Sequence, residues 1–149
     1  MKTSRGFTLV ELLVVFAMGA LIIGIAPLAF GRMRESAEYR ETLQTLISEM
    51  RAARLGAISQ GRETRFAVNL QQRWYGIEGK SRHPIASALT LRATVGANEL
   101  QQDGLASIRF LPGGGASGGS FDLLRASGAG VRLRVDWMTG RVEQEPLAP

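Results

Sequence analysis

The feature that most restricts the fold is an uncharged apolar run at residues 12–30, which is 19 residues long and directly follows Glu11. As a helix rising about 1.5 Å per residue, this run would be about 28 Å long, close to a bilayer core of about 30 Å. A cleaved secretory signal is the alternative, but the run exceeds a typical signal core and no A-x-A-like site precedes a polar mature start. The sequence therefore predicts a retained membrane helix, which Pro27 could interrupt near its end.

The residues before this run form a short basic leader. Residues 5–12, RGFTLVEL, resemble the class III leader of type IV prepilins and pseudopilins. The resemblance implies that a prepilin peptidase removes residues 1–6 by cutting after Gly6 and then methylates the new amine of Phe7. It also implies a single-pass protein of the inner membrane, with residues 7–30 as the transmembrane and filament-core helix and with the C-terminal domain in the periplasm.

Glu11 is the most informative single residue of this region. A carboxylate in mid-membrane costs on the order of 2.5–3.5 kcal/mol on insertion scales, so such a residue usually has a partner. Cleavage after Gly6 would give Phe7 a positively charged amine. One rigid helix cannot easily bring that amine to its own Glu11, whereas an axially staggered neighbour can. We therefore expect Glu11 to pair with a neighbour's Phe7 amine and to fix the register during filament assembly.

Residues 31–61 are expected to continue as an amphipathic helix into the soluble domain. Apolar residues recur there mostly at steps of three and four, the period of one helix face. They are Leu43, Leu46, Ile47, Met50, Ala53, Ala57 and Ile58. Gly61 can adopt the left-handed conformation that closes helices, so the helix is expected to end near it.

Residues 62–149 change to the alternating pattern of β-strands. Apolar residues alternate over 64–70, and a second run at 74–77 follows a polar triplet, as in a hairpin. Further strands are expected at 89–95, 107–111, 120–124, 131–137 and 141–143. One helix followed by six or seven strands predicts an α+β domain. With the leader, this implies the type IV pilin-like fold, a long N-terminal helix packed on antiparallel β-sheet.

The C-terminal half carries a second spaced pattern: IxFxPG at 108–113, ASGG at 116–119, FxL at 121–123 and VDxxTGRV at 135–142. It resembles the C-terminal signature of the GspH/FimT family. The resemblance implies a minor pseudopilin of a type II secretion system, a structural subunit at the tip of the periplasmic pseudopilus. Its partners would be the major pseudopilin, other minor pseudopilins, the prepilin peptidase, and the secretin or a secreted substrate. The alternative is a FimT- or FimU-like minor type IV pilin acting in pilus assembly or DNA uptake.

Composition excludes several classes of site. The chain has no cysteine, so neither a disulfide nor a thiolate metal site can form. Residues 32–149 hold 16 basic and 12 acidic residues, a mild excess that permits nucleic-acid contact without arguing for it. His83 is the only histidine and is expected in an exposed polar loop, so no metal site is predicted.

Two patterns that approach catalytic or binding motifs have structural explanations. Residues 113–120 are spaced like a phosphate-binding P-loop, but Gly119 stands where the lysine must be and a strand follows instead of a helix. A flexible turn is expected there. Asp122 and Asp136 could pair as acid and base, yet a strand end or a turn accounts for each. The sequence therefore predicts neither an enzyme nor a cofactor.

The aromatic residues near arginines allow a second function. Trp74, Tyr75 and Trp137 could stack on bases beside Arg73 and Arg134. Aromatic side chains in strands more often pack in a core or across a sheet, and the acidic C-terminal tail does not supply the basic patch that DNA binding requires. Packing is therefore the favoured interpretation of all three.

Overall fold

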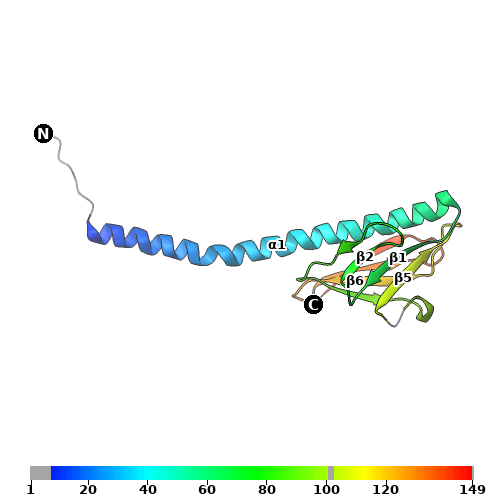
Figure 1. The fold of residues 1–149 in the computed structure, drawn as a ribbon. Coiled ribbons are helices and arrows are strands. Elements are labelled where there is room, and N and C mark those ends of the chain that lie inside the picture. Colours follow the sequence, from blue (N-terminus) through cyan, green and yellow to red (C-terminus); the bar gives the residue numbers. More distant parts are fainter. Residues whose placement is uncertain (1–7, 101–102, 149) are drawn as a thin grey trace. The chain divides into compact units, whose positions relative to one another are not determined.

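The computed structural model describes residues 8–100 and 103–148, and the side chains of residues 22–32 lie outside this description (Figure 1). Gly6 and Phe7, the predicted processing site, are thus outside the described residues, as is part of the predicted span 7–30. The chain divides into two units, Met1–Ala37 and Glu38–Pro149, and each is described here by itself.

Helix α1 spans Leu9–Gln60 and runs through Pro27 without a break. Thr8 caps its amino end, because Thr8 Oγ1 accepts a hydrogen bond from the backbone N of Glu11 at 3.3 Å. A Thr followed three residues later by a Glu is the sequence pattern of a capping box, which satisfies free backbone donors at a helix start. Over the described residues, no helix has both the length and the apolar character that crossing a membrane requires.

The carboxyl-terminal part of α1 carries the core-facing stripe of the larger unit. Leu46, Met50, Ala53 and Ala57 of the predicted stripe are buried, and Tyr39 and Thr42 are buried as well. Ile58 was assigned to the same stripe, but its side chain is 43% exposed. One residue turns a helix by about 100°, which moves Ile58 from the side of Ala57 to the side of Arg54. The helix ends at Gln60, and Gly61 follows with a φ of 62°, as predicted.

Within the described residues, eight strands form two antiparallel sheets. The first sheet has the order β3-β2-β1-β5, with β1 at Thr64–Asn69, β2 at Trp74–Ile77, β3 at His83–Pro84 and β5 at Leu105–Phe110. The second has the order β4-β6-β7-β8, with β4 at Thr90–Thr94, β6 at Gly119–Leu124, β7 at Gly130–Val135 and β8 at Val142–Leu147. A short 3-10 helix, η1, covers Ala97–Glu99. The predicted α+β class and pilin-like arrangement are confirmed.

Two strands depart from the sequence prediction. Strand β3 was not predicted, because two residues carry no periodic pattern and His83 forms a strand only by pairing with Tyr75. Strand β8 was predicted to be short but continues to Leu147, since pairing with β7 extends a polar segment that has little strand propensity of its own. The predicted hairpin at 71–73 is present, and its turn holds Arg73 at a φ of 55°.

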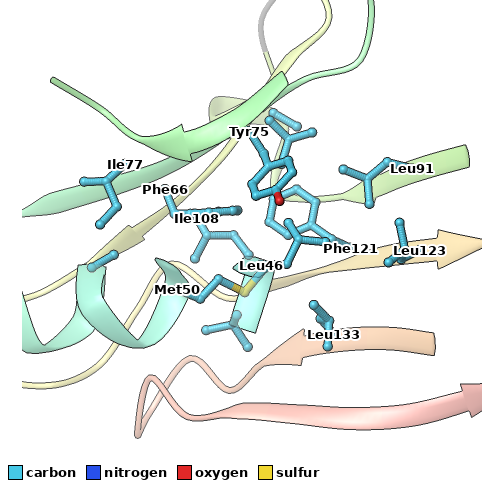
Figure 2. Close-up of a cluster of buried hydrophobic side chains, with 14 of the residues drawn as sticks. Leu46, Met50, Phe66, Tyr75, Ile77, Leu91, Ile108, Phe121, Leu123 and Leu133 are labelled. Atoms are coloured by element: carbon cyan, nitrogen blue, oxygen red, sulfur yellow. The ribbon is translucent and has the colours of Figure 1, made fainter. Parts of the chain in front are cut away.

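The core joins α1 to the inner faces of both sheets (Figure 2). Leu46 and Met50 of the helix lie in one buried cluster with Phe66, Ile108, Phe121 and Leu133 of the strands. Phe66 of the first sheet meets Phe121 of the second edge to face, with ring centroids 5.7 Å apart. This aromatic pair is a direct link between the two sheets.

Replacing Phe66 with Ala should lower the free energy of unfolding by about 3–5 kcal/mol, because a fully buried ring is removed and a cavity is left between the sheets. Guanidinium unfolding of the detergent-solubilised chain, followed by tryptophan fluorescence, measures the change. Lys80→Ala, an exposed change in the β2–β3 turn, should stay within about 0.5 kcal/mol of the parent. Equal free energies of unfolding for the two variants would show that this aromatic contact does not contribute to stability.

Candidate functional site

Among the residues predicted to act in processing and assembly, Glu11 is the one that the described structure includes. Its side chain is exposed in the first turn of α1, where a negative charge interacts favourably with the helix dipole. Its backbone N is satisfied by Thr8. This capping role was missed at the sequence level, although the spacing of Thr8 and Glu11 carries the signal. Glu11 is thus compatible with helix initiation and is free to meet a partner through its carboxylate.

The C-terminal signature residues converge on the carboxyl end of α1. Arg54 Nε donates to the carbonyl oxygen of Gly114 at 3.2 Å and to that of Thr139 at 2.9 Å. Ala116 N also donates to the carbonyl oxygen of Trp137 at 2.9 Å. One arginine on the helix therefore ties the β5–β6 loop to the β7–β8 turn, two segments that are far apart in the sequence.

Glycine is required where these two segments meet. Gly140 has a φ of 63°, and a Cβ at this position would lie 2.4 Å from the carbonyl oxygen of Gly114. Gly114 itself has a φ of 89°. The β5–β6 loop forms the predicted turn, in which Leu111 N donates to Gly115 O and Gly114 N donates to Leu111 O. The glycines of the signature thus allow close backbone contact and do not form a phosphate cradle.

Asp136 organises the β7–β8 turn, as the sequence predicted. Its Oδ1 accepts hydrogen bonds at 2.8 Å from both the backbone N and the hydroxyl of Thr139, and Gly140 N donates to its carbonyl oxygen. The backbone hydrogen bond from Thr139, followed by that from its hydroxyl, lowers the pKa of Asp136 below its usual value. The carboxylate is therefore a charged acceptor that holds the turn.

Large apolar side chains are exposed around this junction. Leu55 and Ile58 of α1 are 61% and 43% exposed, and Trp137 and Met138 of the turn are 65% and 66% exposed. Packing was predicted for Trp137, and this prediction is wrong. Residues 136–140 leave the sheet to form a tight turn, and a side chain at the tip of a turn has no opposite strand to cover it. The prediction is correct for Tyr75, which is buried.

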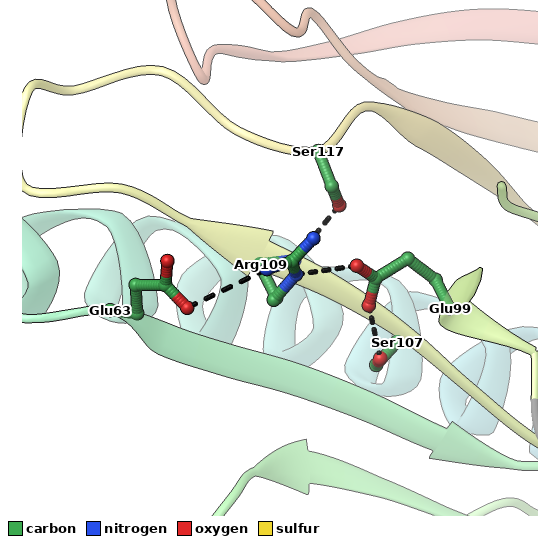
Figure 3. A network of polar contacts seen from close by, with 5 residues as sticks. All are labelled: Glu63, Glu99, Ser107, Arg109 and Ser117. Carbon is green, nitrogen blue, oxygen red and sulfur yellow. Dashed lines mark hydrogen bonds and ion pairs between the residues drawn. The ribbon is translucent and has the colours of Figure 1, made fainter.

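A buried carboxylate ties η1 to β5 (Figure 3). Glu99 of η1 is 7% exposed; its Oε1 accepts from Arg109 Nε and its Oε2 from the hydroxyl of Ser107 at 2.8 Å. Arg109 also lies 3.7 Å from Glu63, and its backbone N donates to Ser117 Oγ. The hydrogen bond and charge of Glu99 raise the pKa of Arg109. No sequence pattern predicted this network, which ties η1, β5 and the β5–β6 loop together.

Two cross-strand ion pairs cover the outer face of the second sheet. Arg132 donates to Asp122 through Nε at 2.7 Å and through its terminal nitrogen at 2.9 Å, and the hydrogen bond and charge of Asp122 raise the pKa of Arg132. Arg134 lies 3.6 Å from Glu145. Asp122 was assigned to a strand end, but it lies within β6, and its register opposite Arg132 explains its presence there.

His83 was predicted to be exposed in a loop, and this is wrong. It lies in β3, its ring stacks on Tyr75 at a centroid distance of 5.4 Å, and its Nε2 is 3.6 Å from Glu49 of α1. The pairing of β3 with β2 decides this position, and no local pattern shows it. Within the residues that the structure describes, no cluster of three or more histidine and acidic side chains could hold a metal ion.

Comparisons with known proteins agree with this arrangement. Residues 42–140 match the family described as type II transport protein GspH, and residues 1–27 match the prokaryotic N-terminal methylation motif. The chain belongs to the GspH family. It is 32% identical over 144 residues to the type II secretion system protein H of Xanthomonas campestris pv. campestris, with 96% of this chain and 84% of that protein covered.

Solved structures share the GspH fold of this chain. The minor pseudopilin EpsH from the type 2 secretion system of Vibrio cholerae superimposes with a TM-score of 0.58 at 11% identity, covering 73% of this chain and 97% of EpsH. The type IV minor pilin FimU of Pseudomonas aeruginosa gives a TM-score of 0.56 at 19% identity, covering 78% of this chain and 96% of FimU. The resemblance stated from the leader and the C-terminal signature is confirmed.

The glycine requirement of the GspH signature can be tested with two glycines of similar conformation. Gly140 and Gly79 have φ values of 63° and 80°, but a Cβ at Gly79 would meet nothing within 4 Å. Both Ala variants should carry left-handed strain of about 1–2 kcal/mol. Only Gly140→Ala should add an overlap cost of about 1–3 kcal/mol. Thermal unfolding of both variants measures the difference. Equal melting temperatures would show that the backbone at Gly114 can move away from a Cβ at position 140 without a cost in stability.

Proposed function

We propose that this chain is a minor pseudopilin of a type II secretion system. It is a structural subunit of the periplasmic pseudopilus that supports export of folded proteins across the outer membrane. The observation that carries the proposal is the 32% identity to a type II secretion system protein H over 84% of that protein's length. In this role the chain works by assembly and not by catalysis.

The anchor in this proposal is the helix over residues 7–30 in the inner membrane, with residues 62–149 in the periplasm. Two observations support it. The uncharged run at 12–30 has the length of a bilayer core. From Leu9 to Leu21, the large apolar side chains of α1 are exposed in the smaller unit, and a lipid or filament environment would cover them.

Processing prepares this helix for assembly. The match of residues 1–27 to the N-terminal methylation motif supports cleavage by a prepilin peptidase after Gly6 and methylation of the Phe7 amine. The new charge at Phe7 then meets the carboxylate of Glu11 in an adjacent subunit. The partners are the major pseudopilin and the other minor pseudopilins, with the secretin or the secreted cargo as further contacts.

A FimU-like minor pilin remains the second candidate, because the fold of FimU matches almost as well as that of EpsH. On the second sheet, the pairing of the two arginines of β7 weighs against a DNA-binding role for that face. Arg132 makes a bidentate contact with Asp122, and Arg134 lies beside Glu145, so phosphate binding would have to displace carboxylates from both. The exposed carboxylates of β8 would also repel a phosphate backbone.

Deletion of the coding sequence in its own host separates the two candidates. The deletion should reduce the export of type II substrates to the medium, and the intact chain supplied on a plasmid should restore it. Pilus-dependent motility and DNA uptake should be unchanged, because a pseudopilus does not carry them. Normal secretion together with lost motility or uptake would overturn the proposal in favour of the pilus.

Replacing Glu11 with Gln should leave the folded domain intact and reduce incorporation into the pseudopilus. The amide keeps the size of the side chain but strands the neighbour's Phe7 charge, and breaking one partner of a desolvated pair costs about 3–5 kcal/mol. Co-purification with the other pseudopilins measures incorporation, and intact mass checks cleavage after Gly6 in the same cells. Asp at position 11 serves as the charge-retaining control. Normal assembly of the Gln variant would show that the charge is dispensable.

A further inference from the structure

A groove lies beside the carboxyl end of α1, and Arg54 and Gly140 of the junction described above form part of its lining. Its volume is about 340 Å³. We call it the basic groove, and its lining residues are Arg51, Arg54, Leu55, Gly140, Arg141 and Val142. It lies entirely within the unit Glu38–Pro149.

The basic groove keeps its positive charge. Three of its six lining residues are arginines and none is acidic. Arg54 Nε is held by two backbone carbonyls, which leave the guanidinium charge without a counterion. Arg51 and Arg141 are exposed, and within residues 8–100 and 103–148 neither guanidinium makes an ion pair. Arg109, Arg132 and Arg134, by contrast, all have carboxylate partners.

Exposed apolar side chains lie on the same two segments that form the groove, the carboxyl end of α1 and the β7–β8 turn. Leu55 lies in the groove itself, Ile58 is one turn further along α1, and Trp137 and Met138 stand on the turn that Arg54 fixes to the helix. Single exposed apolar residues are ordinary, but here four come from two segments that one arginine ties together. Tryptophan, methionine and arginine are also the residue types enriched in the cores of protein interfaces.

We propose that the basic groove and these apolar neighbours form the docking surface for another pilin-like subunit, which presents a carboxylate flanked by apolar side chains. The inference rests on the proposed function and names the chemistry of the contact. A carboxylate suits the free guanidinium forks of Arg51 and Arg141. A nucleic acid or an anionic lipid headgroup would satisfy those charges but would leave Leu55 and Met138 in water, so a protein surface fits better.

The hydrogen bonds of Arg54 to the carbonyl oxygens of Gly114 and Thr139 give this surface a fixed form. Arg54, Asp136 and Gly140 hold the turn against the helix, so little chain ordering is needed on binding. The signature residues of the loop and the turn then have two roles. They hold the two segments together at the carboxyl end of α1, and they form part of the surface against which the partner docks.

Photocrosslinking in the native host provides the first test. A benzophenone amino acid replaces Leu55 in the full chain, and the same amino acid at Lys80 serves as the control on an unrelated exposed turn. Irradiation should give an adduct at position 55 with a pilin-like subunit, and mass spectrometry should place the link beside an Asp or Glu. Absence of an adduct above that at position 80, or an adduct with DNA or lipid, would overturn the inference. An adduct with a pilus subunit would support the surface while overturning type II secretion as the function.

Charge reversal provides the second test. Arg51→Glu combined with Arg141→Glu should reduce the position-55 adduct at least tenfold. Arg65→Glu combined with Lys80→Glu changes the net charge equally at residues that do not line the groove and should leave the adduct unchanged. Thermal unfolding of each variant confirms that the domain is folded, and the milder pair Arg51→Gln with Arg141→Gln should give an intermediate loss. Equal crosslinking by both reversed pairs would show that the groove charge plays no part.

Discussion

The apolar stripe of α1 leaves water by packing against both sheets of the larger unit at once. Leu46 and Met50 lie in the same buried cluster as Phe66 of the first sheet and Leu133 of the second. The edge-to-face contact of Phe66 with Phe121 joins the sheets directly. The Arg54 junction depends on this closure, since the sheets hold the β5–β6 loop and the β7–β8 turn at the carboxyl end of α1.

Polar contacts fix the loops that the hydrophobic core does not hold in place. Arg54 ties two loops to the carboxyl end of α1 through two carbonyl oxygens, and Glu99 ties η1 to β5 through Arg109 and Ser107. The Arg54 network joins segments that are distant in sequence. Because a buried charge without partners is costly, these contacts specify one arrangement of the loops. A rigid end to the domain is what a filament subunit needs for repeated contacts of fixed geometry.

Sequence patterns predicted the regular elements well and the irregular ones poorly. The end of α1 at Gly61 and the hairpin at Arg73 follow from local backbone preferences, so they could be read directly. The strand at His83 and the ion pair of Asp122 with Arg132 could not, because each exists only through a partner supplied by another strand. Trp137 was misplaced for a related reason, since burial depends on what lies opposite a residue.

The sequence by itself determined the leader, the apolar run after Glu11, the amphipathic period of the helix and the family to which the chain belongs. These are local or short-range properties, and each is encoded in residues close together along the chain. Only the tertiary structure decided that Gly114 and Gly140 of the C-terminal signature meet beside Arg54. It also decided that, among the residues it describes, Arg51 and Arg141 make no ion pair while Arg132 and Arg134 do. Charge pairing and exposure depend on distances between residues in the folded protein, and the spacing of residues along the sequence does not determine those distances.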